Sequence, residues 1–147
     1  MLIKCTQMTK GPVCEVGAGF YSTSVLHWLS LGRLFVSYEA DQEYFHYARK
    51  FQTNNHRAKK CSWDYKEVDY DKEWSVVLID HRAEPLTRGD AAMKFKNATF
   101  LVLHDTEFSE HYGYDKVYPL YKYRYDNTEH RPHTTVLSNT IDVTKWN

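Results

Sequence analysis

The chain has 147 residues, the size of one ordinary domain with its own hydrophobic core, and we expect a single domain over residues 1–147. It carries 19 Lys and Arg against 19 Asp and Glu, so its formal net charge is +0 and no overall basic field attracts nucleic acid or an anionic membrane. No apolar run approaches the roughly 20 residues of a membrane-spanning helix, and the N-terminus lacks the apolar stretch of a signal peptide.

The three cysteines indicate a reducing compartment. Cys5, Cys14 and Cys61 are odd in number and lack metal-binding spacing, and two of them lie in apolar contexts typical of strands. We therefore expect reduced thiols in the core rather than a disulfide framework, and a cytoplasmic protein.

Short apolar runs alternate with helical patterns along the chain, which predicts an α/β fold. Unbroken apolar runs are typical of strands buried on both faces, so the sheet should be mostly parallel with helices on both faces. In chain order we expect a strand at Pro12–Val16, a helix at Ser22–Leu31, a strand at Leu34–Tyr38, a helix at Gln42–Phe51, a weak strand at Lys59–Cys61, a strand at Val76–Ile79, a helix at Thr87–Phe95 and a strand at Phe100–Leu103. Two further strands, Tyr121–Tyr125 and Thr134–Leu137, predict a C-terminal antiparallel hairpin.

A glycine loop follows the first strand and precedes the first of these helices. It runs from Glu15 through Gly17, Ala18 and Gly19. The two glycines let the backbone turn tightly and approach a ligand, and a helix N-terminus offers free N–H groups. Glu39 ends the next strand, where a carboxylate can accept hydrogen bonds from both ribose hydroxyls of an adenosine. The pattern predicts a cofactor that contains adenosine.

Two cofactor classes share this layout. The dinucleotide fingerprint G-x-G-x-x-G/A has Gly or Ala at its third conserved position, where this chain has Ser22. In addition, the carboxylate of Glu15 suits a ligand with an amino group better than a pyrophosphate. A nucleotide- or NAD-binding oxidoreductase is therefore the less favoured alternative. A second alternative is a non-catalytic binding module with a degenerate form of the fold.

The loop and its acidic partner resemble motifs of the class I methyltransferases, which use S-adenosylmethionine. Their first motif, E/D-x-G-x-G, is matched by Glu15, Gly17 and Gly19, and the acid that ends their second strand is matched by Glu39. The resemblance implies a Rossmann-like fold, with Glu15 holding the amino-acid end of the cofactor and Glu39 its ribose.

The later motifs of the same family extend the resemblance to about Leu103. A polar or acidic residue after the third strand lies near the adenine, and Trp63 and Asp64 stand at that place. The fourth motif lies after the fourth strand, at Asp80. The resemblance thus implies that Trp63, Asp64 and Asp80 also contact S-adenosylmethionine.

Acidic and imidazole side chains follow the fourth and fifth strands. Asp80, His81 and Glu84 follow the fourth, and His104 and Asp105 follow the fifth, so all should lie on the rim that holds the cofactor. This arrangement resembles the catechol-type O-methyltransferases, in which a carboxylate after strand four and an Asp-Asn pair after strand five bind a divalent cation.

Two mechanisms remain open at this rim. Asp80 and Asp105 match the positions of the metal ligands, but Thr106 replaces the Asn of the pair, and a hydroxyl is a poorer ligand. Without a metal, His104 or His81 would be the general base that takes a proton from the acceptor, and Asp105 would orient the imidazole.

The C-terminal third is rich in tyrosine. Aromatic and cationic residues interleave from Tyr112 to Arg131, a pattern that can clamp single-stranded nucleic acid or a planar acceptor. The strict alternation at Tyr121–Tyr125 favours an amphipathic strand instead. We expect the segment Phe108–Tyr118, with Gly113, to form a loop over the pocket.

The short flanks of the domain limit the acceptor. Only about eleven residues precede the first strand, where many methyltransferases carry a helical cover. We therefore expect a small-molecule acceptor, or a pocket completed by a second copy of the chain in a homodimer. Nucleic acid is a less favoured partner, because the motifs of DNA amino methylation are absent from the sequence.

Overall fold

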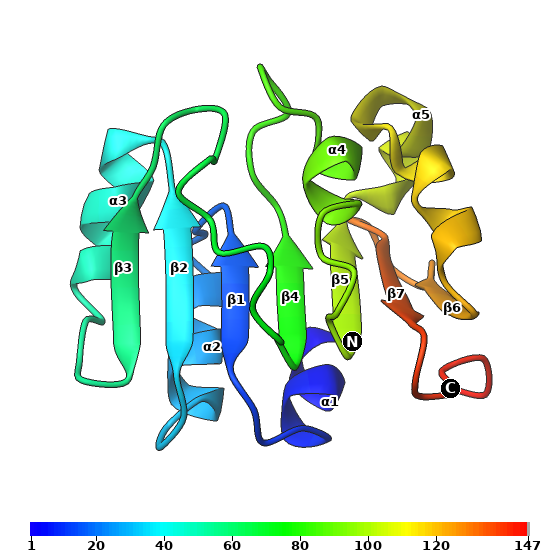
Figure 1. Cartoon of the computed structure of the whole chain (residues 1–147), viewed down its shortest axis with the longest axis horizontal. Helices are drawn as coiled ribbons and strands as arrows, with labels where there is room; N and C mark the ends of the chain where they lie inside the picture. The colour runs from blue at the N-terminus through cyan, green and yellow to red at the C-terminus, as the bar shows by residue number, and fades with distance from the viewer. Residues whose placement is uncertain (147) are drawn as a thin grey trace.

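The computed structural model describes residues 1–146, which form one seven-stranded sheet in the order β3-β2-β1-β4-β5-β7-β6 (Figure 1). The strands are β1 Val13–Val16, β2 Phe35–Glu39, β3 His56–Lys60, β4 Val76–Ile79, β5 Phe100–His104, β6 Tyr123–Asn127 and β7 Thr134–Ser138. The helices are α1 Leu2–Gln7, α2 Ser22–Leu29, α3 Gln42–Arg49, α4 Arg88–Ala92 and α5 Ser109–Tyr112, with 3-10 turns η1 Thr106–Phe108, η2 Tyr114–Lys116 and η3 Tyr118–Leu120.

The sheet is parallel except at its C-terminal edge. Strands β1 to β5 pair in parallel, whereas β7 runs antiparallel to both β5 and β6. The predicted mostly parallel sheet with a terminal hairpin is confirmed. Because parallel strands point the same way, the carboxyl ends of β1, β2, β4 and β5 lie along one edge, where ligands bind in such sheets.

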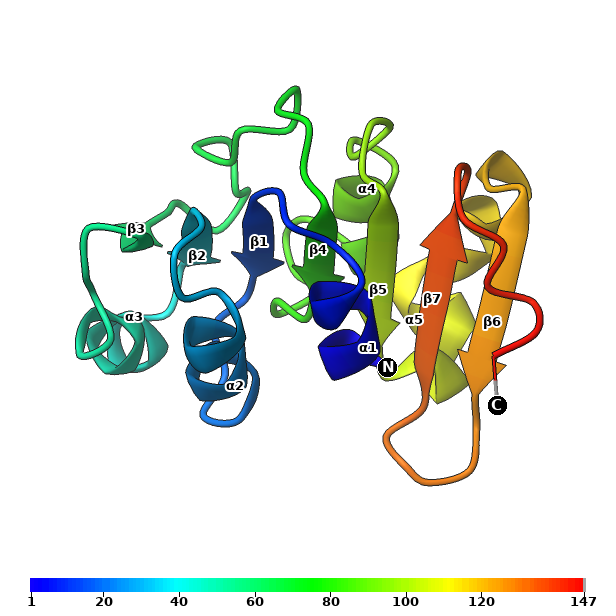
Figure 2. The ribbon, with the colours of Figure 1, turned by 90° about the horizontal axis from the view of Figure 1, so that it is seen from below.

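Helices cover both faces of the sheet. Helices α1, α2 and α3 lie on one face, and α4 lies on the other (Figure 2). The alternation along β1 shows the two cores, because Val13 belongs to the same buried cluster as Leu26 of α2, whereas Cys14 belongs to the cluster that includes Ala91 of α4. All three cysteines are buried free thiols.

Two predicted elements have different bounds in the structure. Helix α4 is shorter than the predicted Thr87–Phe95, because Thr87 is its N-cap and accepts a hydrogen bond from Asp90 N, while Phe95 N already bonds in a tighter turn to Ala92 O. Strand β3 lies at His56–Lys60 rather than Lys59–Cys61. It is an edge strand with exposed basic residues, so it lacks the apolar run that marks a buried strand.

Two helical segments were not predicted. Helix α1 precedes the first strand and packs against α2, although no side chain caps its N-terminus. The segment Phe108–Tyr118 forms short helical turns rather than a loop, and Gly113 ends α5 in the left-handed conformation at φ 71°. Within residues 1–146, no helix is both long and apolar enough to cross a membrane.

In the C-terminal hairpin, the alternating tyrosines of β6 face the core and the residues between them face solvent. Tyr123 and Tyr125 of β6 are half-buried and pack against the core on the α1 face, while Arg124 and Asp126 are exposed. The pattern is that of an amphipathic edge strand.

Candidate active site

The glycine loop joins β1 to α2 at the ligand-binding edge of the sheet. Gly17 has φ +92°, a conformation that favours glycine, and its N–H donates to Tyr38 O at 2.9 Å. Gly19 N donates to Thr23 Oγ1 at 3.1 Å, which fixes the loop against the first turn of α2. The loop therefore bends away from β1 with its backbone close to the ends of the neighbouring strands.

Glu39 joins this loop to the end of β2. Its Oε2 accepts a hydrogen bond from Ala18 N at 2.6 Å, and its Oε1 accepts one from Asp41 N at 2.6 Å. Burial raises the pKa of Glu39, and the two backbone N–H donors partly oppose that shift. Each oxygen has a second lone pair, so the carboxylate can still accept hydrogen bonds from a ligand.

A cavity of about 560 Å³ opens beside Glu39. Its lining combines predicted and unpredicted residues from the ends of β1 to β4 and from the starts of α3 and α4: Ala18, Gly19, Phe20, Tyr21, Glu39, Asp41, Tyr44, Trp63, Asp80, His81, Arg82 and Arg88. Trp63 is 40% exposed, with the Arg82 guanidinium 5.7 Å from its ring centre. The volume of the cavity is in the range of sites for cofactors and drug-sized molecules.

Glu15 lies beneath the loop rather than in the cavity, which corrects its expected contact with the cofactor. Its side chain is 0% exposed, and its Oε2 accepts hydrogen bonds from Thr23 Oγ1 and Ser37 Oγ. Burial raises its pKa to about 7, against the effect of these hydroxyl donors. Since Thr23 also accepts from Gly19 N, Glu15 supports the shape of the loop from below.

Asp64 also lies outside the cavity. It is exposed, accepts a hydrogen bond from Ser62 Oγ and lies 4.0 Å from Lys66 Nζ. The turn after β3 thus directs Trp63 to the cavity and Asp64 to solvent, a difference that adjacent positions in a turn can produce.

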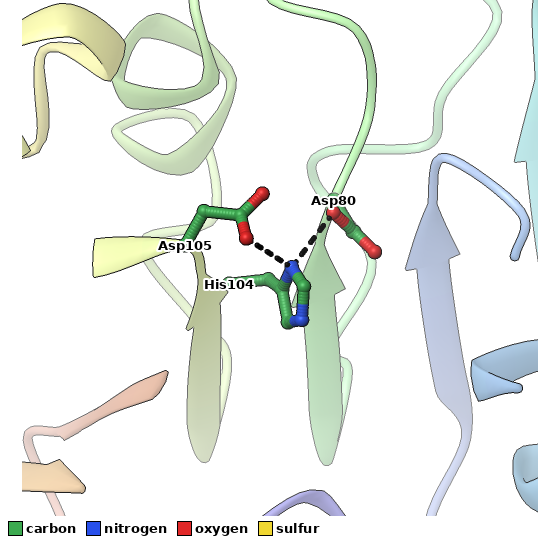
Figure 3. Close-up of side chains that lie close together, drawn as sticks. All are labelled: Asp80, His104 and Asp105. Atoms are coloured by element: carbon green, nitrogen blue, oxygen red, sulfur yellow. Dashed lines mark ion pairs between the residues drawn. The ribbon is translucent and has the colours of Figure 1, made fainter. Parts of the chain in front are cut away.

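Asp80, His104 and Asp105 converge where β4 and β5 end side by side (Figure 3). His104 Nδ1 lies 3.1 Å from Asp80 Oδ1 and 3.2 Å from Asp105 Oδ1. The other ring nitrogen, Nε2, lies on the far side of the ring from both carboxylates (Figure 3). Asp105 has φ 58°, an uncommon conformation for a residue other than glycine, and such strain often accompanies functional sites.

The charge state of His104 reflects two opposing effects. Burial opposes its charged form, but the contact with Asp80 and the negative charges of Asp80 and Asp105 outweigh burial and raise its pKa. The ring therefore takes up a proton more readily than an ordinary histidine, which suits a general base.

His81 and Glu84 do not join this group. His81 is 1% exposed, its Nδ1 lies 2.6 Å from Arg82 O, and its ring centre lies 4.6 Å from that of Tyr65, at a tilt of 41°. Burial lowers its pKa to about 4. Although His81 lines the first cavity, its Nε2 is buried and its pKa is lowered, so it is less suited than His104 to act as a base. Glu84 is exposed.

Arg88, which the sequence did not single out, braces the same corner. This first residue of α4 is 6% exposed, and its guanidinium lies 3.0 Å from Asp80 Oδ1 and 2.9 Å from Asp105 Oδ2. Asp80, His104 and Asp105 offer three ligand atoms within 4.8 Å of one another, a group that could hold a metal ion. Asp80 and Asp105 are the two metal ligands that the sequence predicted. Both of these carboxylates are already paired with Arg88.

A second cavity, of about 390 Å³, adjoins the first and shares Gly19, Phe20, Tyr21 and Asp80 with it. The rest of its lining is mostly apolar and comes from α1, α2 and the sheet: Met1, Leu2, Ile3, Ser22, Val25, Leu78, Val102, His104 and Thr134. Helix α1 thus forms a wall that we did not expect. The segment Phe108–Tyr118 lines neither cavity, so it is not the expected cover.

Solved structures with the same fold are methyltransferases. The chain superposes on a protein from Staphylococcus aureus assigned as a caffeoyl-CoA O-methyltransferase with a TM-score of 0.70 and 12% identity, covering 92% of this chain and 80% of that one. For a precorrin-6y C5,15-methyltransferase from Geobacter metallireducens GS-15 the TM-score is 0.67 with 14% identity, over 92% and 83% of the two chains.

A protein from Pyrococcus horikoshii assigned as an RNA methyltransferase is also similar, with a TM-score of 0.58, 10% identity and coverage of 92% of this chain and 76% of that one. No protein-family profile matches the chain, and no curated protein matches it in sequence. The fold is therefore that of the class I, Rossmann-like methyltransferases, as the sequence motifs predicted.

Proposed function

We propose that the protein is a methyltransferase that uses S-adenosylmethionine. The observation that carries the proposal is Glu39, whose carboxylate accepts from Ala18 N of the glycine loop and borders the 560 Å³ cavity. The residues there suit the cofactor, because a carboxylate with free lone pairs can bind ribose hydroxyls and the loop exposes backbone close to the ligand. S-adenosylmethionine supplies a methyl group activated by a positively charged sulfur.

We propose that the acceptor is a small molecule in the second cavity. That cavity is smaller than the first and mostly apolar. It adjoins the first cavity, because the two share four lining residues. Its lining contains no Lys or Arg side chain, the residues that most often contact the phosphates of a nucleic acid. A homodimer that completes this site stays a prediction.

His104 is the residue that we propose as general base. It lines the second cavity, and its Nδ1 lies within 3.2 Å of the carboxylates of both Asp80 and Asp105, so Nε2 is the nitrogen left to take a proton from the acceptor. The carboxylates orient the ring and stabilise the imidazolium that forms. Holding the acceptor in line with the methyl group contributes much of the rate in such reactions.

Calorimetric titration tests the cofactor. We would titrate the protein with S-adenosylmethionine, S-adenosylhomocysteine and NAD, and compare Glu39→Ala with Glu43→Ala. Glu43 is an exposed glutamate nearby on α3 that lines neither cavity. Loss of hydrogen bonds from the ribose to a charged partner should weaken binding of the first two ligands at least about tenfold in Glu39→Ala only.

The other outcomes separate the alternatives. Binding of NAD in preference to S-adenosylmethionine would support the oxidoreductase. Absence of binding by all three ligands to folded protein would contradict the proposed cofactor and favour a non-catalytic binding module.

A further inference from the structure

Arg88 uses every donor of its guanidinium at the ends of β4 and β5. Nε donates to His81 O at 2.6 Å, and one terminal nitrogen donates to His104 O at 3.2 Å and Asp105 Oδ2 at 2.9 Å. The other terminal nitrogen lies 3.0 Å from Asp80 Oδ1 and 3.5 Å from Asp80 O. These five contacts match the five N–H groups of a guanidinium.

Aromatic residues from the segment after β5 fix this guanidinium in place. Arg88 Cζ lies 4.2 Å from the ring centre of Tyr112, and Tyr114 Oη donates to His104 O at 2.9 Å. A Cβ on Gly89 would lie 2.1 Å from Gly113 O, so α4 packs directly on the end of α5. The guanidinium of Arg88 is therefore fixed by contacts with the ends of β4 and β5 and with Tyr112 of α5.

The contacts of Arg88 coincide with those that a metal would need. Asp80 Oδ1 is shared, because it lies 3.0 Å from Arg88 and 3.1 Å from His104 Nδ1. Asp105 is divided, with Oδ2 on Arg88 and Oδ1 on His104. A divalent cation that used these carboxylates would lie beside a fixed positive charge in a mostly buried corner, where the repulsion is weakly screened.

We propose that Arg88 takes the place of a divalent cation at this corner. It neutralises Asp80 and Asp105, holds them at the distance that suits His104, and leaves the group of Asp80, His104 and Asp105 without affinity for a metal. Arg88 is a positioning residue, since it acts on His104 through the two carboxylates. Its catalytic consequence, a methyl transfer that needs no metal, rests on the proposed function.

The choice of arginine follows from the geometry. A lysine has one ammonium group with three donors, and it cannot reach two carboxylates and three carbonyls at once, whereas the planar guanidinium spans them. The low exposure of Arg88 makes each of these contacts stronger than it would be in water.

Mn²⁺ titration of the protein alone tests the proposal without cofactor or acceptor. Electron paramagnetic resonance would count bound Mn²⁺ in the wild type, in Arg88→Met and in Arg88→Met combined with Asp105→Asn. Removing the charge should tighten Mn²⁺ binding by at least about tenfold, since a guanidinium a few Å away strongly repels a divalent ion, and the second change should reverse the gain. Equal, weak binding by wild type and Arg88→Met would overturn the proposal.

A measurement on the wild type covers the case in which Arg88→Met does not fold. Mn²⁺ broadens the NMR signals of nuclei close to it, so the ring signals of His104 should remain sharp in its presence while those of exposed histidines set the background. Selective broadening of His104 at Mn²⁺ concentrations that leave His46 sharp would overturn the proposal. Because neither experiment includes S-adenosylmethionine, failure of the cofactor titration leaves both results interpretable.

Activity provides a separate readout of positioning. Methyl transfer by the wild type should be unchanged by a chelator, and Arg88→Lys should lower kcat without rescue by added Mn²⁺. Activity of the wild type that a chelator abolishes and Mn²⁺ restores would contradict the inference.

Discussion

A Cβ on Gly17 would lie 2.4 Å from the backbone of His81, well inside the distance that two atoms tolerate. The two residues follow the paired strands β1 and β4, so the close approach is between the two strand ends at the edge of the sheet. Gly17 is therefore required by the packing of the sheet as well as by the shape of the loop.

Gly17→Ala should destabilise the protein and abolish cofactor binding. A left-handed conformation costs a residue with a side chain about 1–2 kcal/mol, and the clash with His81 adds to this. The control is Gly32→Ala, which has a similar φ of +83° but open space around it. Thermal unfolding and calorimetry should show a small loss of stability and normal binding for Gly32→Ala; equal effects of the two changes would contradict the role of the clash.

Glu15→Gln should stabilise the protein at alkaline pH. The pKa of Glu15 is raised by burial to about 7 in the folded state, so its contribution to stability is complete below its unfolded value of 4.5 and is lost as pH rises through 7. A glutamine does not titrate, and its carbonyl can still accept from Thr23 and Ser37. From pH 4 to pH 8 its free energy of unfolding should rise by roughly 3 kcal/mol relative to wild type.

Denaturant unfolding at a series of pH values measures this difference. The exposed Glu43→Gln serves as control and should give a difference that does not vary with pH. A constant difference for Glu15→Gln as well would show that Glu15 ionises normally in the fold.

The rate of methyl transfer should rise with pH through the pKa of His104. A general base acts in its neutral form, and the pKa of His104 is raised because Asp80 and Asp105 outweigh the effect of burial. His104→Gln should lower kcat about 10²- to 10⁴-fold, while His46→Gln, an exposed histidine of α3, should not.

Asp105→Asn tests whether Asp105 raises the pKa of His104. Asparagine tolerates the left-handed conformation at this position, so the backbone should be retained. Loss of the negative charge should move the rising part of the pH–rate profile to lower pH. An unchanged profile would indicate that Asp105 does not act on His104.

The apolar runs, the glycine loop and the acid at Glu39 were readable in the sequence, because each signal depends on neighbours along the chain. Buried parallel strands give unbroken apolar runs, as at Val76–Ile79, whose bounds were predicted correctly. Elements without such signals were missed: the uncapped α1 and the short helical turns after β5 depend on packing against α2 and α4 for their stability.

The sequence by itself determined the class of fold, the edge of the sheet that carries the candidate site and several of the side chains that gather there, such as Glu39, Asp80 and His104. Only the tertiary structure decided which of them meet. Asp80, His104 and Asp105 come together because β4 and β5 pair in register, whereas His81 turns against Tyr65 and Glu15 is covered by α2. Arg88 carried no sequence signal, because an arginine at the start of a short helix is common. Its role depends on tertiary packing, which places the guanidinium between two carboxylates that follow different strands.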